Sequence, residues 1–597
     1  MGEERQQRRW PFIVADVMTG LFLFCGTATV VWLQNARLTV LYDLAGVLEP
    51  ATRMAQGDIP YRDFPFPYAP LTFLTQAAVI KLTGPVYWHH IVYCCIVAGL
   101  ASVLAWRIIY RLIETTLPRP RLTAFLLSLP LIPLGVYCVF PHPFYDPDAC
   151  FVVVLCVWAL LWLERREWPS VPTIAVGALL VLPLFFKQNI GLAFGAAIGL
   201  GLFIWIIFGV WKKWELRPYL LLTAGALVGL GIAALIINQT CGLANYKHWT
   251  WDFATSRRAP SAGAMLGVYA DWSLLAWLAL ILLGAWLFRR FSEGKPWETA
   301  LAITAIAVPF IWPVIYLLID RDSSERAERL IGLWPVTMIA LVVLGYAFCR
   351  RLSGVAAALP LILTATAHGV FLSQQLWGST YAIWPLLMIM IALLLRQLYD
   401  PEGCRTGLAV TILAGVISAS VCTAGAFYVY SEERLDYVNW NDGEMQHSTR
   451  PQLAGMSMRG DLLPQFDELV KWTDANIPRD DGVLFLPGED LFFYTTQRRT
   501  HFPVQLFDVT NNPYDAEEIH ARVAASDVEW VIVKDEQEIE ADDMIDSKSK
   551  IFEQVKPDFR HIEDLDNYTV WKRRHPGDPP DDEDDDSDDS GNDDSGD

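Results

Sequence analysis

The chain has 597 residues, of which 53% are hydrophobic, and its formal net charge is −20. The apolar residues gather in long blocks, which excludes an ordinary water-soluble protein. These blocks are too long and too continuously apolar for the alternating strands of a membrane β-barrel. Because only helices and closed barrels satisfy the backbone inside a bilayer, the sequence predicts a polytopic α-helical membrane protein.

About thirteen stretches approach the roughly 20 apolar residues that a helix needs to cross the hydrocarbon core. They begin near Trp10, Val86, Leu122, Ala149, Val171, Ile190, Pro218, Trp272, Ala300, Leu330, Gly354, Tyr381 and Gly407. The N-terminal segment is too polar and the first stretch too long for a cleaved signal peptide, so this stretch is expected to remain as an anchor.

Lysine and arginine gather on the short connections that lie on the same side of the membrane as the N-terminus, for example Arg107, Arg111, Lys212 and Lys213. Positive loops face the cytoplasm, which predicts a cytoplasmic N-terminus. An odd number of spans then places the C-terminal region outside, so the expected location is the cell (inner or plasma) membrane.

The first outer loop, residues 34–85, contains Asp43 shortly after the first span. An ionisable residue at the edge of a span is costly when it faces lipid, which favours a functional role. A helix cap or an interfacial aspartate is the alternative. The loop continues with Asp58 and a proline–aromatic run over 60–70, which is irregular because proline fixes φ and removes a donor. An aromatic belt at the lipid headgroups explains Tyr61, Phe64, Phe66 and Tyr68 equally simply.

The second outer loop, residues 141–148, ends in Asp146-Pro147-Asp148. These three residues resemble the Asp-x-Asp motif that binds a metal–nucleotide in soluble sugar transferases. Capping of the fourth predicted span by Asp146, with proline in the first turn, explains the same residues. Both interpretations stay open.

Several basic residues on the outer side are candidates for phosphate binding. Lys187 interrupts an apolar stretch and is able to hold a phosphate as a point charge, although it equally fits a side chain that reaches lipid headgroups. The outer loop 239–271 contains Arg257 and Arg258, and arginine suits bidentate phosphate recognition, although anionic headgroups attract the same residues. His89 and His90 are interpreted as interfacial packing residues.

The acidic excess belongs to the C-terminal part of the chain. Residues 430–575 are predicted to form a soluble α/β domain, because helices alternate with short apolar strands. The predicted helices are DELVKWTDANI and DAEEIHARVAA, and the predicted strands are VLFLP, VEWVIVKD and YTVWKRR. The acidic tail, 576–597, has no apolar residue to bury and is expected to be a disordered, solvated extension, with a cation-binding or partner-binding arm as the alternative.

The ten cysteines lie in or near the spans without Cys-x-x-Cys spacing, so neither metal ligation nor redox chemistry is expected. The sequence contains neither a Rossmann fingerprint nor a P-loop. No metal site and no cofactor are therefore predicted, although a divalent metal is possible, and no nucleic-acid partner is expected.

Together, Asp43 after the first span, MAQGDIPYRDFPFPYAPL, YDPD before the fourth span and a soluble α/β end resemble the GT-C membrane glycosyltransferases. The chain is most similar to the bacterial branch akin to protein O-mannosyltransferases and the lipid A aminoarabinose transferase. The resemblance implies a GT-C-like catalytic domain over 1–429. The chain departs from the family pattern where Leu44, rather than glutamate, follows Asp43. The lysine that often precedes the double proline is also missing, and Arg62 or Lys187 is expected to replace it.

The resemblance implies a sugar donor on a polyprenyl phosphate and a glycan, lipid or protein acceptor, in contact with membrane lipids. Asp43 would be the general base, while Asp146, Asp148, Asp58 and Tyr68 would line the donor or acceptor site. Lys187, Arg62, Arg257 and Arg258 would bind the phosphate. A transporter or flippase of a lipid-linked glycan is the alternative, although no convincing internal repeat supports it. An inactive scaffold is a third interpretation.

Overall fold

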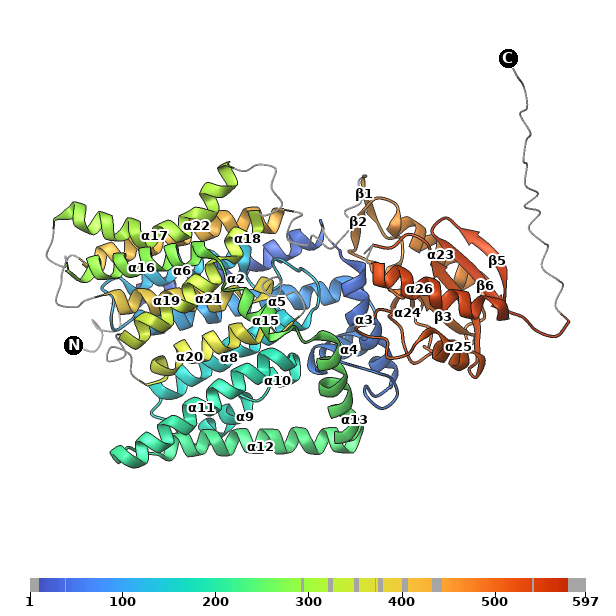
Figure 1. The fold of residues 1–597 in the computed structure, drawn as a ribbon, viewed down its shortest axis with the longest axis horizontal. Helices are drawn as coiled ribbons and strands as arrows, with labels where there is room; N and C mark the ends of the chain where they lie inside the picture. The colour runs from blue at the N-terminus through green and yellow to red at the C-terminus, as the bar shows by residue number, and fades with distance from the viewer. Residues whose placement is uncertain are drawn as a thin grey trace, which may run out of the picture.

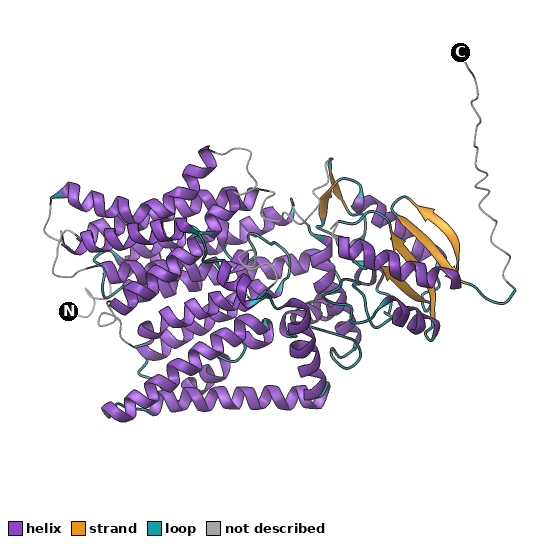
Figure 2. Cartoon of the chain, viewed as in Figure 1, coloured by secondary structure: helices purple, strands orange, loops and turns teal. Residues whose placement is uncertain are grey.

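A computed structural model describes residues 10–37, 39–290, 295–319, 326–347, 354–370, 372–373, 380–399, 406–431, 443–538 and 542–577. Long helices form a bundle, and an α/β region sits at one end of it beside α3 (Leu41–Gln56) and α4 (Leu71–Thr83) (Figure 1). Every strand that the structure describes belongs to this α/β region (Figure 2). Most of the acidic tail, 578–597, lies outside the described residues.

Eight helices within the described ranges are long and apolar enough to cross a membrane. They are α2 (Trp10–Asn35), α5 (Tyr87–Ile113), α8 (Tyr145–Arg165), α11 (Gln188–Lys212), α12 (Arg217–Thr240), α16 (Trp272–Arg290), α17 (Pro296–Ile319) and α22 (Thr406–Tyr430). Shorter apolar helices are α4, α9 (Ser170–Leu179) with α10 (Pro183–Phe186), α19 (Leu333–Ala347), α20 (Val355–Val370) and α21 (Trp384–Leu398). The chain is a polytopic helical membrane protein, as its composition predicts.

The number and length of the helices differ from the thirteen predicted spans. The stretch expected as one span from Leu122 is two short helices, α6 (Pro120–Ser128) and α7 (Leu131–Leu134). Pro130 lies between them, and proline removes a backbone donor and clashes with the preceding turn. Four further predicted spans, those beginning near Val171, Leu330, Gly354 and Tyr381, correspond to helices shorter than 18 residues.

One of these short helices, α21, lies inside the bundle rather than against lipid. Apart from Arg396, every residue of α21 is buried. A helix that is apolar on all sides is typical of a buried core element. The apolar side chains of α21 therefore pack against other helices and not against lipid.

The expected outer loops contain helices. Within 34–85, α3 is amphipathic, with Leu41, Leu44 and Leu48 buried on one side. The segment 239–271 contains four short helical pieces. These are α13 (Leu243–Lys247), the π-helical η1 (His248–Phe253), α14 (Ala254–Arg258) and α15 (Ala262–Gly267). One more short helix, α18 (Arg326–Ile331), precedes α19.

The α/β region contains a four-stranded sheet in the order β3-β4-β6-β5. Strands β3 (Gly482–Leu486) and β4 (Val528–Lys534) are parallel, whereas β6 (Tyr568–Arg573) pairs antiparallel with both β4 and β5 (Phe559–Leu565). The three predicted strands are confirmed as β3, β4 and β6. The remaining elements are β1 (Met445–His447), β2 (Ser457–Arg459), η5 (Pro451–Leu453), α23 (Leu462–Asn476), α24 (Phe492–Thr496), α25 (Ala516–Ala524), α26 (Asp542–Val555) and η6 (Lys556–Asp558).

Two buried charged residues of α3 attach this helix to the α/β region. Glu49 accepts a hydrogen bond from the backbone N of Tyr494 at 3.1 Å, and Arg53 donates to the carbonyl oxygens of Phe502 and Pro503 at 3.2 and 2.9 Å. Glu49 and Arg53 are only 3% and 6% exposed. Buried polar groups of this kind are stable only while these partners stay in place.

The buried Glu49 carboxyl makes this interface sensitive to pH. Burial raises the pKa of Glu49 from its ordinary 4.5 to about 8, and the negative charge of Asp490 adds to the same shift. A carboxyl whose pKa is raised by folding stabilises the folded state fully below its unfolded pKa, and this contribution is lost as the pH rises through the folded value. The interface should therefore weaken between about pH 5 and pH 8.

Glu49→Gln is expected to remove the part of this pH dependence that Glu49 causes. This pH dependence is measured by thermal unfolding of the full-length protein in nanodiscs at pH 5 to 9, with protease cleavage of the α/β region as the readout of unfolding. Equal pH slopes for wild type and Glu49→Gln would contradict the assignment.

Candidate functional site

Asp43 lies in the first turn of α3, where the chain has just left the first span, α2. Its side chain is half-buried and interacts electrostatically with the hydroxyl groups of Tyr42 and Tyr145. The N-cap residue is Val40 and no side chain caps the helix from that position, so Asp43 is not the N-cap residue. A carboxylate in the first turn is stabilised in its ionised form by the helix dipole.

The proline–aromatic run packs inside the protein. Tyr61, Phe64 and Phe66 are 5%, 5% and 2% exposed, so the headgroup-belt explanation is wrong for these three rings. They pack edge-on against one another, and Phe66 contacts the half-buried Tyr68 at a centroid distance of 5.6 Å. This packing fixes Tyr68, whose ring lies 5.2 Å from that of Tyr145 at the start of α8.

Arg258, at the end of α14, contacts this aromatic cluster. Its Nη2 donates to the Tyr68 hydroxyl at 2.6 Å and to Thr510 Oγ1 at 2.7 Å, and the guanidinium lies 4.4 Å from the centre of the Tyr68 ring. A weaker contact of 3.4 Å reaches the side-chain oxygen of Asn511. All of these partners are uncharged at neutral pH, and Arg258 Nε is buried without a hydrogen-bond partner among the described residues. No carboxylate contacts the guanidinium directly among the described residues, although Asp508 acts on it electrostatically.

The π-helical segment η1 comes shortly before Arg258. π-Helical turns are rare and occur frequently at functional sites, because the extra residue changes the direction in which the following side chains point. Arg257 and Arg258 are adjacent in sequence, yet only Arg258 faces the tyrosines. Arg257 is exposed and donates to the carbonyl of Val509 at 3.3 Å.

Lys187 forms an ion pair with Asp146, which also accepts a hydrogen bond of 3.1 Å from the Tyr381 hydroxyl. The Asp146 side chain is 2% exposed and that of Lys187 is 11% exposed. Lys187 Nζ lies 4.9 Å from the centre of the Tyr145 ring, so this pair borders the same cluster as Arg258. Because Asp146 neutralises Lys187, Arg258 is the stronger anion-binding group of the two.

Asp148 faces different partners from Asp146, although only one residue separates them. Its carboxylate accepts hydrogen bonds from Thr72 at 2.8 Å, Tyr93 at 2.7 Å and Tyr137 at 2.6 Å. The helix α8 begins at Tyr145 with Phe144 as N-cap, and no side chain caps it from that position, so the capping explanation for Asp146 is wrong. Asp146 belongs to the ion pair, whereas Asp148 ties α8 to α4 and α5.

Asp148→Ala is expected to destabilise the protein, because it removes the acceptor of the Thr72, Tyr93 and Tyr137 hydroxyl groups, and each buried group left without a partner costs about 1–3 kcal/mol. Tyr137 keeps a second acceptor, the carbonyl oxygen of Phe144 at 3.2 Å. The unfolding temperature in nanodiscs should drop by several degrees, and Thr72→Val, which removes one donor only, should lower it less. An unchanged unfolding temperature for Asp148→Ala would show that these hydrogen bonds contribute little.

Two other predicted site residues lie elsewhere. Asp58 pairs with Arg53 at 2.6 Å and with Arg499 of the α/β region at 3.3 Å. Arg62 is half exposed and pairs with its neighbour Asp63 at 2.8 Å. Asp58 thus belongs to the interface with the α/β region, and Arg62 to the surface of the turn after it.

The sequence did not point to several residues of this cluster. Tyr42 donates its hydroxyl to Asp508 at 2.7 Å, and Asp508 accepts from the backbone N of Thr510 and Asn511 at 2.6 and 2.8 Å. Tyr145 was visible only as part of YDPD, and 508–511 carries no motif. No local pattern predicts these contacts, because the partners come from opposite ends of the chain.

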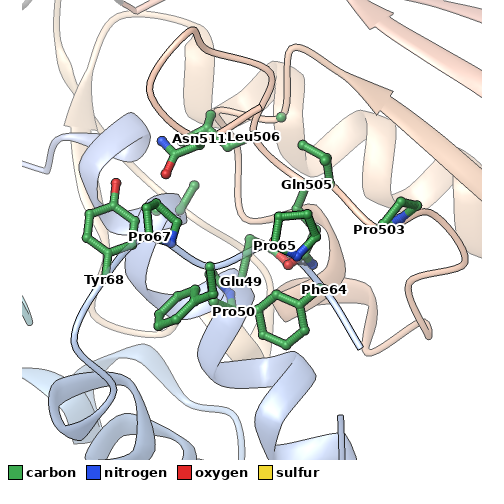
Figure 3. Close-up of a pocket in the computed structure, with 15 residues that line it drawn as sticks. Glu49, Pro50, Phe64, Pro65, Pro67, Tyr68, Pro503, Gln505, Leu506 and Asn511 are labelled. Atoms are coloured by element: carbon green, nitrogen blue, oxygen red, sulfur yellow. Dashed lines mark hydrogen bonds between the residues drawn. The ribbon is translucent and has the colours of Figure 1, made fainter. Parts of the chain in front are cut away.

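A small cavity adjoins the cluster, with a volume of about 40 Å³. Figure 3 shows Pro65 and Pro67 of the proline–aromatic run facing Gln505 and Asn511 of the α/β region across it. Tyr68 and Asn511 line the cavity and also contact Arg258, so the two features are continuous. The volume is sufficient for about one ordered water molecule.

Asp146 and Asp148 do not converge on one point as an Asp-x-Asp metal site would, because each is bonded to its own partners. Over the described ranges, no group of three or more histidine, cysteine, aspartate or glutamate side chains is placed to hold a metal ion.

No protein-family model and no curated protein sequence matches the chain. Solved structures similar to it include ArnT from Cupriavidus metallidurans bound to undecaprenyl phosphate, at 14% identity and a TM-score of 0.43, covering 94% of this chain and 99% of that one. The Archaeoglobus fulgidus oligosaccharyltransferase in its apo form is also similar, at 12% identity and a TM-score of 0.47, covering 87% of this chain and 69% of that one. The similarity extends over most of this chain.

Proposed function

We propose that this chain is a membrane glycosyltransferase that moves a sugar from a polyprenyl-phosphate-linked donor to an acceptor hydroxyl, with Asp43 as the general base. One observation carries the proposal. The half-buried Asp43 interacts electrostatically with Tyr145, and the half-buried guanidinium of Arg258 contacts Tyr68, whose ring lies beside that of Tyr145. A base and a cation that forms no direct ion pair among the described residues suit transfer from a lipid phosphate.

The reaction follows from these two charges. Asp43 accepts the proton of the acceptor hydroxyl while the acceptor oxygen forms a bond to the anomeric carbon of the sugar. The bond between that carbon and the phosphate oxygen breaks, and its electron pair stays on the departing polyprenyl phosphate. Arg258 stabilises the negative charge that develops there. Lys187, whose charge Asp146 compensates, and the exposed Arg257 contribute less than Arg258.

Tyr68 and Tyr145 form the wall between the base and the cation. Each ring is half-buried: Tyr68 lies against the Arg258 guanidinium and Tyr145 stacks on Phe144, and part of each ring remains exposed. Aromatic faces of this kind pack well against the apolar face of a sugar or an isoprenoid chain. The acceptor in this proposal is a glycan, a lipid or a protein that carries a hydroxyl group.

The proposed topology places the N-terminus in the cytoplasm and Asp43 together with the α/β region outside the cytoplasm of a cell or inner membrane. Its basis is the positive charge of the short connections. This topology requires that shorter apolar helices also cross the membrane, so that the number of spans rises from the eight long helices to about the predicted thirteen.

Added protease should cleave the α/β region in right-side-out membranes and leave it intact in inverted vesicles. An engineered protease site between Ser431 and Gly443 gives a defined fragment to detect. Cleavage in inverted vesicles only would reverse the orientation and place Asp43 on the wrong side for an external acceptor.

Lipid analysis of membranes tests the proposed activity. Cells that lack this protein should accumulate one polyprenyl-phosphate-linked sugar, and wild-type protein but not Asp43→Asn should remove it. Removal by both proteins would favour an inactive scaffold or a flippase, because neither role needs a base at position 43.

A further inference from the structure

The helix that carries Asp43 is attached to the α/β region along its whole length. At its centre, Glu49 and Arg53 make the buried contacts described above. At its end, Gln56 donates to the carbonyl of Arg498 at 3.3 Å, and Asp58 pairs with Arg499. The orientation of α3 is therefore set by the α/β region as well as by the membrane helices.

The first turn of α3 has an unusual cap. An α-helix begins with backbone N–H groups that lack partners, and the N-cap side chain normally accepts from one of them. Val40 has no group that accepts, whereas Glu538 of the α/β region, 496 residues away, accepts from the backbone N of Tyr42 at 2.9 Å. The backbone of Leu41 also bonds to Glu538. A distant carboxyl group thus caps the turn that contains Asp43.

The other end of Tyr42 is held by the same region. Its hydroxyl donates to Asp508 at 2.7 Å, and the other oxygen of Asp508 accepts from the backbone and side chain of Thr510, both at 2.6 Å. Thr510 Oγ1 in turn accepts from Arg258 at 2.7 Å. Asp508 therefore connects the neighbour of the proposed base to the proposed phosphate-binding cation through one turn.

Glu538 is itself firmly anchored. It is 2% exposed, and its backbone N donates to Glu489 at 2.8 Å. Glu489 pairs with Lys534 at 2.6 Å, and all three residues are buried. Burial and the nearby Glu489 charge raise the pKa of Glu538 to about 8, which favours the neutral form of this carboxyl near neutral pH.

We infer that the α/β region is a positioning device for the reaction. Glu538 and Asp508 fix Tyr42 at its backbone and hydroxyl ends, and they thereby set the distance between Asp43 and Arg258. Neither residue touches substrate; both act through Tyr42, and Asp508 also through Thr510. The inference rests on the proposed function for the roles of Asp43 and Arg258, whereas the capping of α3 by Glu538 is testable without any activity.

Hydrogen exchange of the full-length protein in nanodiscs tests the cap. Glu538→Ala should accelerate exchange at peptides covering 40–45 by about 3- to 30-fold, the range expected when a helix cap is lost. Glu538→Gln mimics the neutral carboxyl and should stay near wild type. Glu536→Ala is the matched control, because Glu536 lies on the same turn with an exposed side chain. Unchanged exchange in Glu538→Ala would overturn the inference.

Transfer kinetics test the positioning of the base. Glu538→Ala should lower kcat by about 10- to 100-fold, since small displacements of a reacting group are costly, while KM for the lipid donor changes less than about 3-fold. Glu538→Gln should keep kcat near the wild-type value. A lower kcat in Glu538→Ala with little change in KM is not what general unfolding produces. Faster exchange with an unchanged kcat would overturn the positioning role. Full activity of Asp43→Asn would instead refute the proposed function. The hydrogen-exchange result would then still show whether Glu538 caps α3.

Discussion

Asp43→Asn should reduce turnover by roughly 10²–10⁴-fold, because the amide keeps the size of the side chain and removes its basicity. Binding of the lipid donor should change little, since Arg258 and the tyrosines remain in place. Steady-state transfer with reconstituted protein and a separate donor-binding measurement distinguish these two effects.

Asp63→Asn is the matched control for this substitution. Asp63 lies in the loop that follows α3, is exposed and pairs with the exposed Arg62. Its replacement should leave turnover within a few-fold of wild type. Loss of folded protein in Asp43→Asn would indicate a structural role for the carboxylate, and unchanged turnover would remove Asp43 as the base.

Arg258→Ala should weaken binding of polyprenyl phosphate by about 30-fold or more, the effect of removing one partner of a desolvated charge pair. Arg258→Lys should recover only part of the loss, because an ammonium group lacks the planar fork of guanidinium. Arg257→Ala should change the affinity by less than about 3-fold, because Arg257 is exposed and an exposed charge contributes about 0–1 kcal/mol.

Polyprenol, which has the same chain and no phosphate, is the matched ligand for this measurement. Its binding should be the same in wild type and Arg258→Ala. Equal losses for both ligands would mean that Arg258 supports the fold of the site and does not contact phosphate. If Arg257→Ala and Arg258→Ala reduced the affinity for polyprenyl phosphate equally, both arginines would act only through the general positive charge of this segment.

The elements that depend on local pattern could be predicted. The long apolar stretches gave the membrane class, and the short apolar runs gave β3, β4 and β6. Strand β5 was missed because FRHIEDL is an exposed edge strand with four charged or histidine residues, which an apolar pattern does not reveal. Helix α21 is predicted as a span from its apolar composition, which does not distinguish contact with other helices from contact with lipid.

The candidate site could be predicted only in part. Asp43, Tyr68, Lys187, Asp146 and Arg258 were singled out from their types and positions, and the structure brings them to one aromatic cluster. The different partners of Asp146 and Asp148 were not predictable, because they depend on which side of α8 faces Lys187 and which faces Tyr93. The contributions of Asp508 and Glu538 depend on contacts more than 460 residues apart, for which one sequence holds no signal.

In the proposed function, this chain transfers a sugar and does not merely move a lipid across the membrane. Purified protein in proteoliposomes, supplied with the lipid-linked sugar that accumulates in its absence and with an acceptor extract, provides the most direct measurement. Mass spectrometry of the lipid fraction should show conversion of the donor to free polyprenyl phosphate by wild-type protein and not by Asp43→Asn. Donor that remains intact, and is found in the opposite leaflet, would contradict the account.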